Sequence, residues 1–119
     1  MLKWQKIENE KELDKILLLT KTLYHDESIL KSNEKRIKSV LKNQNACFYV
    51  LEKESEVTGH FAVFINDELS YENYQKIITV GIYECIDDDE IAKEMFNKIK
   101  KISKELKADY IIGPMDGST

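Results

Sequence analysis

The last third of the 119-residue chain predicts a β-α-β unit, which restricts the folds that the chain can adopt. A strand-like run covers residues 77–85, a helix with an acidic start extends to about Leu106, and a second apolar strand covers 109–112. A helical crossover of this kind joins two parallel strands, which usually belong to a larger α/β sheet. Since the sequence stops at Thr119, soon after the second strand, we expect a domain that is cut off part-way.

The composition indicates a globular chain and argues against several classes of protein. Hydrophobic residues make up 42% of the sequence and charged residues 34%, which is not typical of disorder. Apolar runs such as Ile16 to Leu19 are too short for a membrane span, and Met1 to Trp4 does not begin a signal peptide. The net charge of −4 argues against a nucleic-acid partner. We therefore expect a cytoplasmic protein with no membrane or nucleic-acid partner.

The two cysteines, Cys47 and Cys85, lie in apolar, strand-like runs and lack the spacing of metal ligands. In a cytoplasmic protein, buried free thiols are favoured over a disulfide. We therefore expect no metal site and no covalent cross-link.

The first half of the chain predicts a short strand, two helices and a hairpin. Asn9, with Glu12 three residues later, predicts a capping box at the start of the first helix. Asn33 is expected to cap a second, shorter helix. Strands over 46–53 and 57–65 are separated by three residues, which favours a hairpin. Apolar residues alternate along both faces of the second of these strands.

The helix of the β-α-β unit has the clearest start signal in the chain. Asp87 is expected to be its N-cap, with Glu90 completing a capping box and Ile86 and Ile91 flanking it as a hydrophobic staple. The predicted order is therefore β-α-α-β-β-β-α-β with mixed sheet pairing, an α+β or α/β class, in one domain over residues 1–119.

This order is combined with residues that resemble those of a known family. They are Gly59, Ile65-Asn66, the run Gly81-Ile82-Tyr83-Glu84-Cys85-Ile86-Asp87-Asp88, Ala92, Phe96, Gly113-Pro114-Met115 and Ser118-Thr119. The chain resembles the N-terminal part of the GNAT (Gcn5-related N-acetyltransferase) fold, and more narrowly an uncharacterised bacterial GNAT-like group. Relatives of this kind continue into another helix and two more strands. The resemblance therefore implies a GNAT-like domain that lacks those three elements.

The resemblance implies an acyl-CoA-dependent N-acetyltransferase, or the N-terminal part of one, with acetyl-CoA as the donor. In GNAT enzymes the fourth strand binds the pantetheine arm, so Ile82, Tyr83 and Glu84 are the implied cofactor-binding residues. Glu84 is a candidate general base whose pKa burial would raise, or a glutamate at the wet end of the strand or paired with a lysine. Tyr83 is a candidate proton donor to a leaving thiolate, or a packing residue. His60 is expected to face solvent or to pack beside Phe61.

The turn before the last helix departs from the GNAT pattern. GNAT enzymes place the pyrophosphate of acyl-CoA on a glycine-rich turn, whereas residues 84–90 contain five carboxylates and no Gly, Arg or Gln. These carboxylates would occupy or repel the helix start, so we expect weak binding of acetyl-CoA or none. The alternative function is a catalytically silent GNAT-like module that binds a small-molecule ligand or a protein.

The C-terminal strand predicts self-association. An apolar strand left uncovered presents free backbone N–H and C=O groups, which favour pairing with another chain. We therefore expect a homodimer formed through the strand at 109–112 or the helix beside it, with two-fold symmetry.

Overall fold

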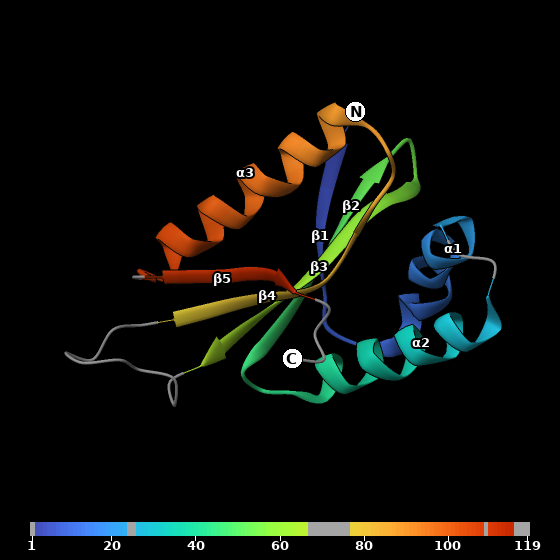
Figure 1. The fold of residues 1–119 in the computed structure, drawn as a ribbon, viewed down its shortest axis with the longest axis horizontal. Helices are drawn as coiled ribbons and strands as arrows, with labels where there is room; N and C mark the ends of the chain where they lie inside the picture. Colours follow the sequence, from blue (N-terminus) through green and yellow to red (C-terminus); the bar gives the residue numbers. More distant parts are fainter. Residues whose placement is uncertain (1, 24–25, 67–76, 109, 116–119) are drawn as a thin grey trace.

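The computed structural model describes residues 2–23, 26–66, 77–108 and 110–115, which form a five-stranded mixed sheet with helices on both sides (Figure 1). The elements are β1 (Leu2–Ile7), the 3-10 helix η1 (Glu10–Glu12), α1 (Leu13–Leu23), α2 (Glu27–Lys42), β2 (Ala46–Lys53), β3 (Glu56–Asn66), β4 (Ile77–Cys85), α3 (Asp89–Glu105) and β5 (Tyr110–Met115). The strands follow the chain order across the sheet, antiparallel from β1 to β4 and parallel between β4 and β5. The predicted order and mixed pairing are confirmed.

The two faces of the sheet carry separate hydrophobic cores. Helices α1 and α2 cover one face, and α3 covers the other (Figure 1). Ala62 of β3 lies in the first core with Ile16 of α1 and Ile37 of α2, whereas Phe61 of β3 lies in the second with Met95 of α3. The alternation predicted along β3 is therefore confirmed, because each face of that strand contacts a helical layer.

Gly59 of β3 lies where α3 approaches the sheet most closely. A Cβ atom at this position would lie 2.8 Å from Sδ of Met95, closer than non-bonded atoms normally come. Glycine thus lets the helix pack directly on the strand.

The second helix begins earlier than the sequence predicted. Asp26 is its N-cap and accepts a 2.8 Å hydrogen bond from the backbone N–H of Ser28. The prediction that Asn33 caps this helix is wrong, because Asn33 is buried in the helix interior. Asn9 does act as a cap, accepting from the N–H of Lys11 at 2.9 Å, but it caps η1.

The cap of α3 lies one residue after the predicted position. Asp88, and not Asp87, is the N-cap, and its carboxylate accepts from the N–H groups of Glu90 and Ile91 at 2.9 and 3.3 Å. The N–H of Asp88 donates to the carbonyl of Ile86 at 2.8 Å, which makes a tight turn. Because of this turn, the helix begins one residue later than the sequence predicted.

Strand β5 continues through Gly113 and Pro114 to Met115, beyond the predicted end at Ile112. Gly113 has a φ of 124°, a conformation that favours glycine, and the register with β4 shifts in this region. The strand therefore bends and continues where the sequence predicted its end. Ser118 and Thr119, which contribute to the family resemblance, lie outside the described residues.

Among the described residues, no helix combines the length and the hydrophobicity that a membrane span needs.

The cap assignment predicts which aspartate of the acidic turn stabilises the fold. Asp88→Ala should lower the free energy of unfolding by about 0.5–2 kcal/mol, because two N–H groups lose their acceptor. Urea denaturation followed by circular dichroism measures this change. Asp87→Ala is the matched control, since it removes a neighbouring charge and keeps the cap, and it should have a smaller effect. An equal loss from both variants would show that charge, and not capping, stabilises this helix start.

Candidate functional site

Strand β4 contains a β-bulge that changes which side chains face each helical layer. His60 and Ala62 of β3 are two residues apart, but their partners Glu84 and Gly81 on β4 are three apart, so β4 has one extra residue. Ile82 in this bulge has a φ of 49°, which is rare for a β-branched residue.

The bulge reverses the alternation along β4. Before it, Ile78 and Val80 belong to the core beneath α3, while after it Ile82 belongs to the core beneath α1 and α2. A shift of one residue turns the following side chains to the opposite face. The bulge thus directs Glu84 toward α2 and Tyr83 toward α3.

The pairing of β4 with β5 extends as far as the bulge. It includes Ile77, Ile78, Thr79 and Gly81, and Gly81 lies opposite Met115, the last described residue of β5. Among the described residues, the segment 82–85 therefore has no partner on β5.

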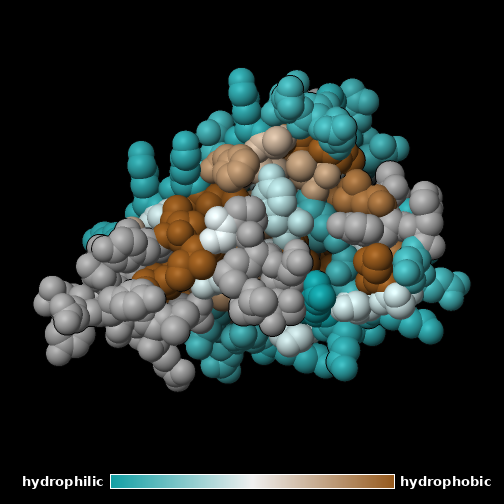
Figure 2. Space-filling view, in the orientation of Figure 1, coloured by the Kyte–Doolittle hydropathy of each residue, from teal (hydrophilic) through white to brown (hydrophobic). Residues whose placement is uncertain are grey.

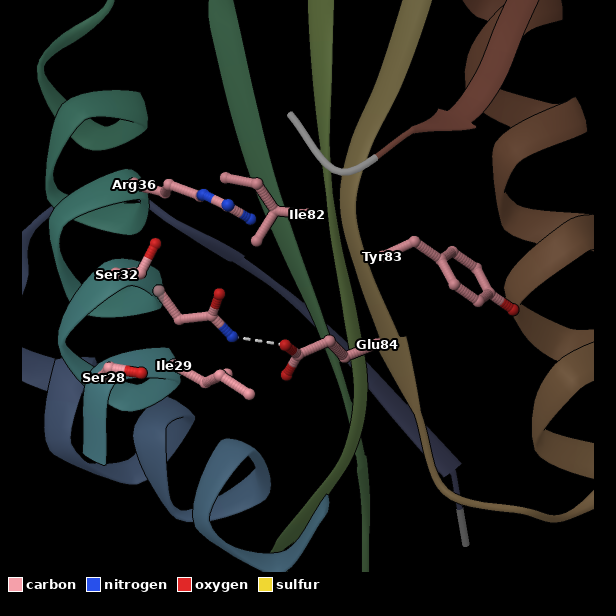
Figure 3. Close-up of a pocket in the computed structure, with 8 residues that line it drawn as sticks. Ser28, Ile29, Ser32, Arg36, Ile82, Tyr83 and Glu84 are labelled. Carbon is pink, nitrogen blue, oxygen red and sulfur yellow. Dashed lines mark hydrogen bonds between the residues drawn. The ribbon is translucent and has the colours of Figure 1, made fainter. Parts of the chain in front are cut away.

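A pocket of 410 Å³ lies between α2 and the bulged part of β4 (Figure 3). Its lining residues are Ser28, Ile29, Ser32, Asn33 and Arg36 from α2, and Ile82, Tyr83 and Glu84 from β4. In Figure 3 the side chains of Ile82 and Glu84 point toward α2, whereas that of Tyr83 points toward α3. The three residues implied as a cofactor site are thus adjacent in β4, but Tyr83 faces away from the other two.

The carboxylate of Glu84 lies at the centre of a buried polar network. It accepts hydrogen bonds from the hydroxyl of Thr20 at 3.1 Å and from the side-chain amide of Asn33, and it lies 3.2 Å from Nε2 of His60. Glu84 is 8% exposed, and His60 and Thr20 are fully buried. The four side chains come from α1, α2, β3 and β4, so the network connects both helices of this layer to the sheet.

The hydrogen-bond geometry determines how many protons the pair of His60 and Glu84 carries. Nδ1 of His60 lies 2.9 Å from the carbonyl oxygen of Ile82, which can only accept, so Nδ1 must carry a hydrogen. The contact between Nε2 and the carboxylate then holds a single proton. The pair is therefore either an imidazolium with a carboxylate or a neutral imidazole with a carboxylic acid.

The environment of Glu84 favours the ionised form of its carboxyl group. Burial alone raises the pKa of Glu84, but the hydrogen bond and charge of His60, with the hydrogen bonds from Thr20 and Asn33, outweigh it and lower the pKa. The expectation that burial would raise this pKa is wrong, because three donors surround the carboxylate. Glu84 is also neither at a wet strand end nor paired with a lysine.

The predicted position of His60 is wrong as well. It is buried and packs on the ring of Phe48, with ring centroids 5.2 Å apart. A sequence signal for the network did exist, since Thr20 interrupts an apolar helical stripe and Asn33 lies four residues before Ile37 on the buried face of α2.

Tyr83 lies in a different environment from Glu84. Its hydroxyl is 4.0 Å from Sγ of Cys85, and the centroid of its ring lies 6.2 Å from the ring centroid of Phe96. Burial, together with the nearby thiol, raises the pKa of Tyr83 to about 12, so the phenol keeps its proton at neutral pH. Phe96 is 48% exposed and lies outside the buried stripe of α3.

Cys47 and Cys85 are free and half-buried. Among the described residues, no group of three or more His, Cys, Asp or Glu side chains is arranged to hold a metal ion.

Comparison with known proteins identifies the fold through solved structures. No protein-family model matches the sequence, and no curated protein matches it significantly. A predicted acetyltransferase from Clostridium acetobutylicum, solved with acetyl-CoA, has a TM-score of 0.67 and 16% identity over 93% of this chain and 79% of its own. An aminoglycoside acetyltransferase from an uncultured soil metagenomic sample has a TM-score of 0.71 and 16% identity over 94% and 78%. Glucosamine-6-phosphate N-acetyltransferase from Arabidopsis thaliana has a TM-score of 0.65 and 14% identity over 98% and 82%.

These structures share the fold of the GNAT acetyltransferases, and this chain has the same fold. The chain spans about four-fifths of the length of each. The fold implied by the sequence resemblance is confirmed.

The lowered pKa of Glu84 predicts how stability depends on pH. The folded carboxyl binds its proton less tightly than the unfolded one, whose pKa is near 4.5, so unfolding takes up a proton in this range. The contribution of Glu84 is thus complete above pH 4.5 and is lost as the pH falls through the lower folded value. Glu84→Gln should lower the free energy of unfolding by about 1–3 kcal/mol at pH 7. This deficit should shrink between pH 5 and pH 3.

Urea denaturation at each pH measures the deficit, and the exposed Glu56 supplies the control. Glu56→Gln should follow the wild-type curve across the same range. A deficit for Glu84→Gln that stays constant from pH 7 to pH 3 would show that Glu84 is not stabilised as an anion.

Proposed function

We propose that the chain is an N-acyltransferase that moves an acyl group from a thioester donor to an amine bound between α2 and β4. The observation that carries the proposal is the position of the bulge, where a stretch of β4 with no β5 partner among the described residues adjoins the pocket of Glu84. An extended donor can pair with this stretch while an amine enters from the α2 side. The GNAT fold agrees with this function but does not establish it.

The proposed reaction needs few groups. The amine nitrogen bonds to the acyl carbon, the bond from that carbon to sulfur breaks, and the proton released by nitrogen balances the one taken up by the thiolate. Glu84 is ionised and can accept a hydrogen bond from the amine, because three donors leave part of its acceptor capacity unused. Tyr83 keeps its proton and remains the predicted donor to the leaving sulfur. Ile82, Tyr83 and Glu84 contribute the backbone edge that would bind the donor.

Acetyl-CoA fits this site only in part. This stretch of β4 suits a pantetheine arm, but the turn before α3 does not suit a pyrophosphate. Asp88 already occupies the N–H groups of Glu90 and Ile91 that an anion would use, and Asp87 and Asp89 add negative charge. We therefore expect acetyl-CoA to bind weakly or not at all, with the contacts to the donor concentrated on its thioester arm.

The acidic turn also supports a second candidate, a catalytically silent module with the GNAT fold. Such a protein would bind a small molecule or a protein through the same pocket without transferring an acyl group. Thiol release separates the two candidates.

The acyltransferase proposal predicts thiol release from S-acetylpantetheine or acetyl-CoA that depends on an added amine. Glu84→Gln should lower kcat/KM by about 100-fold, the lower range for loss of an acid–base group. A thiol-reactive dye measures the release. A folded wild-type protein that releases no thiol with any amine, but still binds a ligand in the pocket, would favour the silent module.

The acidic turn predicts a difference between two donors. Calorimetric titration of the wild type with acetyl-CoA should show weak binding or none. The triple variant Asp87→Asn, Asp89→Asn, Glu90→Gln keeps the Asp88 cap and should bind acetyl-CoA about tenfold more tightly, because three carboxylates near a helix start are removed. S-acetylpantetheine is the matched ligand, since it lacks the pyrophosphate and should bind both proteins equally. Low-micromolar binding of acetyl-CoA to the wild type would contradict the prediction.

The β5 edge supports the proposal of a homodimer. Ile111 and Ile112 are 40% and 38% exposed, and Figure 2 shows hydrophobic residues gathered where Figure 1 places β5. In the described residues β5 pairs with β4 alone, so its outer edge is open to a second copy of the chain. Sedimentation equilibrium at micromolar concentration should give the dimer mass.

Ile111→Lys should give the monomer, because it places a charge on the proposed contact. Leu18→Lys is the matched control, since Leu18 is 59% exposed but lies on α1, and it should keep the dimer mass. A wild-type monomer would contradict the proposal.

A further inference from the structure

The charge that an ammonium ion would meet in the pocket between α2 and β4 depends on Glu84. Among the described lining residues, the ionisable side chains are Glu84, Arg36 and Tyr83. Tyr83 keeps its proton at neutral pH and points toward α3 in Figure 3, and Arg36 is a cation. Within the described lining, Glu84 is therefore the only group available to balance the charge of an ammonium ion.

The contact between Glu84 and His60 leaves the pair without a net charge. Nδ1 of His60 donates to the carbonyl of Ile82 at 2.9 Å, and the 3.2 Å contact between Nε2 and Oε2 of Glu84 holds a single proton. An imidazolium beside a carboxylate and an imidazole beside a carboxylic acid have the same total charge, which is zero. A second buried carboxylate, that of Glu52, is paired with Lys15 at 2.9 Å and does not line the pocket. The described residues thus give the pocket no uncompensated negative charge.

The two oxygens of the Glu84 carboxylate differ in the acceptor capacity that they have left. Oε2 accepts from the hydroxyl of Thr20 at 3.1 Å and contacts His60, whereas Oε1 accepts from the amide of Asn33. A carboxylate oxygen has about two lone-pair directions, so Oε1 can accept one further hydrogen bond. Since the side chain of Glu84 points toward α2 in Figure 3, a ligand in the pocket can supply that bond.

A neutral amine suits this environment better than an ammonium ion. The neutral form gives up only hydrogen bonds to water, which Oε1 of Glu84 and the hydroxyl of Ser32 can replace. An ammonium ion gives up the hydration of a full charge and meets no uncompensated carboxylate among the described residues, so its transfer into the pocket is costly. Only the neutral form has the nitrogen lone pair that attacks an acyl carbon.

We propose that the pocket selects a weakly basic amine, one that is largely neutral at pH 7, such as an aromatic amine or a hydrazine. The amine donates one N–H to Oε1 of Glu84, and Ile29 and Ile82 supply apolar surface for its substituent. The inference rests on the proposed function, because it names the class of acceptor for the same site. The volume of 410 Å³ accommodates an amine with one aromatic ring.

The test compares two amines of nearly equal size and shape that differ in basicity. Phenylhydrazine is a weak base and is neutral at pH 7, whereas benzylamine is protonated. In NMR titrations of the full chain without any acyl donor, phenylhydrazine should bind about tenfold more tightly or better at pH 7, because only a small fraction of benzylamine is in the neutral form. Between pH 7 and pH 9 the affinity of benzylamine should rise by about tenfold per pH unit as its neutral fraction grows, while that of phenylhydrazine stays constant.

A charge added to the pocket wall tests the assigned cause. Ile29 lines the pocket and is 37% exposed, so Ile29→Glu adds a carboxylate there without changing a buried residue. Ile29→Gln is the matched control, because it has the same shape and no charge. At pH 7 the Glu variant should bind benzylamine about tenfold more tightly than the Gln variant, as expected for a hydrogen bond between charged groups.

The outcomes are distinct from those of the acyltransferase test. Equal binding of the two amines by the wild type at pH 7 would overturn the inference, and so would an affinity for benzylamine that does not rise with pH, whether or not either variant folds. Equal affinity of Ile29→Glu and Ile29→Gln for benzylamine would overturn it too. Since no donor is present, a missing thiol release would refute acyl transfer but would leave these binding results unchanged.

Discussion

The buried carboxylate of Glu84 is the constraint on which this half of the structure depends. An ionised carboxyl away from water is tolerated only when donors replace its hydration, and here each donor comes from a different element. Thr20 belongs to α1, Asn33 to α2 and His60 to β3, so satisfying one anion fixes three elements relative to β4. Apolar packing alone would fix these distances less closely, because it has little directional preference.

His60 extends the constraint to the backbone of β4. A bulge removes one residue from the regular ladder, and the carbonyl of Ile82 accepts from Nδ1 of His60 instead. The same imidazole thus supports the strained conformation of Ile82 and the charge of Glu84. The bulge at Ile82 and the pocket carboxylate are therefore supported by a single side chain.

The comparison with the sequence shows which features local patterns can predict. The β-α-β unit, the hairpin and the two-sided alternation of β3 follow from periodicities within single elements, and the structure confirms them. The predicted helix caps were less accurate. Asp87 and Asp88 are chemically equal candidates for the N-cap of α3, and the tight turn in which the N–H of Asp88 donates to the carbonyl of Ile86 makes Asp88 the cap. The polar positions Thr20 and Asn33 are visible in the sequence, but their common partner Glu84 could not be predicted, because its position depends on a bulge. In a regular ladder His60 would face Tyr83, and the extra residue in β4 brings Glu84 opposite it.

The two ends of the proposed donor site differ in how many backbone groups are available to a ligand. The edge of β4 can bind an extended arm without any particular side chain, because backbone groups supply the hydrogen bonds. The start of α3 has no such freedom, because its few N–H groups can serve either a capping carboxylate or a phosphate. Asp88 occupies them, and this stabilises α3, whose Met95 lies in the same core as Phe61 of β3. Fold stability and nucleotide binding therefore compete for the same atoms in this chain. In the proposed site, this competition disfavours a pyrophosphate at the start of α3 and leaves the pocket beside β4 unaffected.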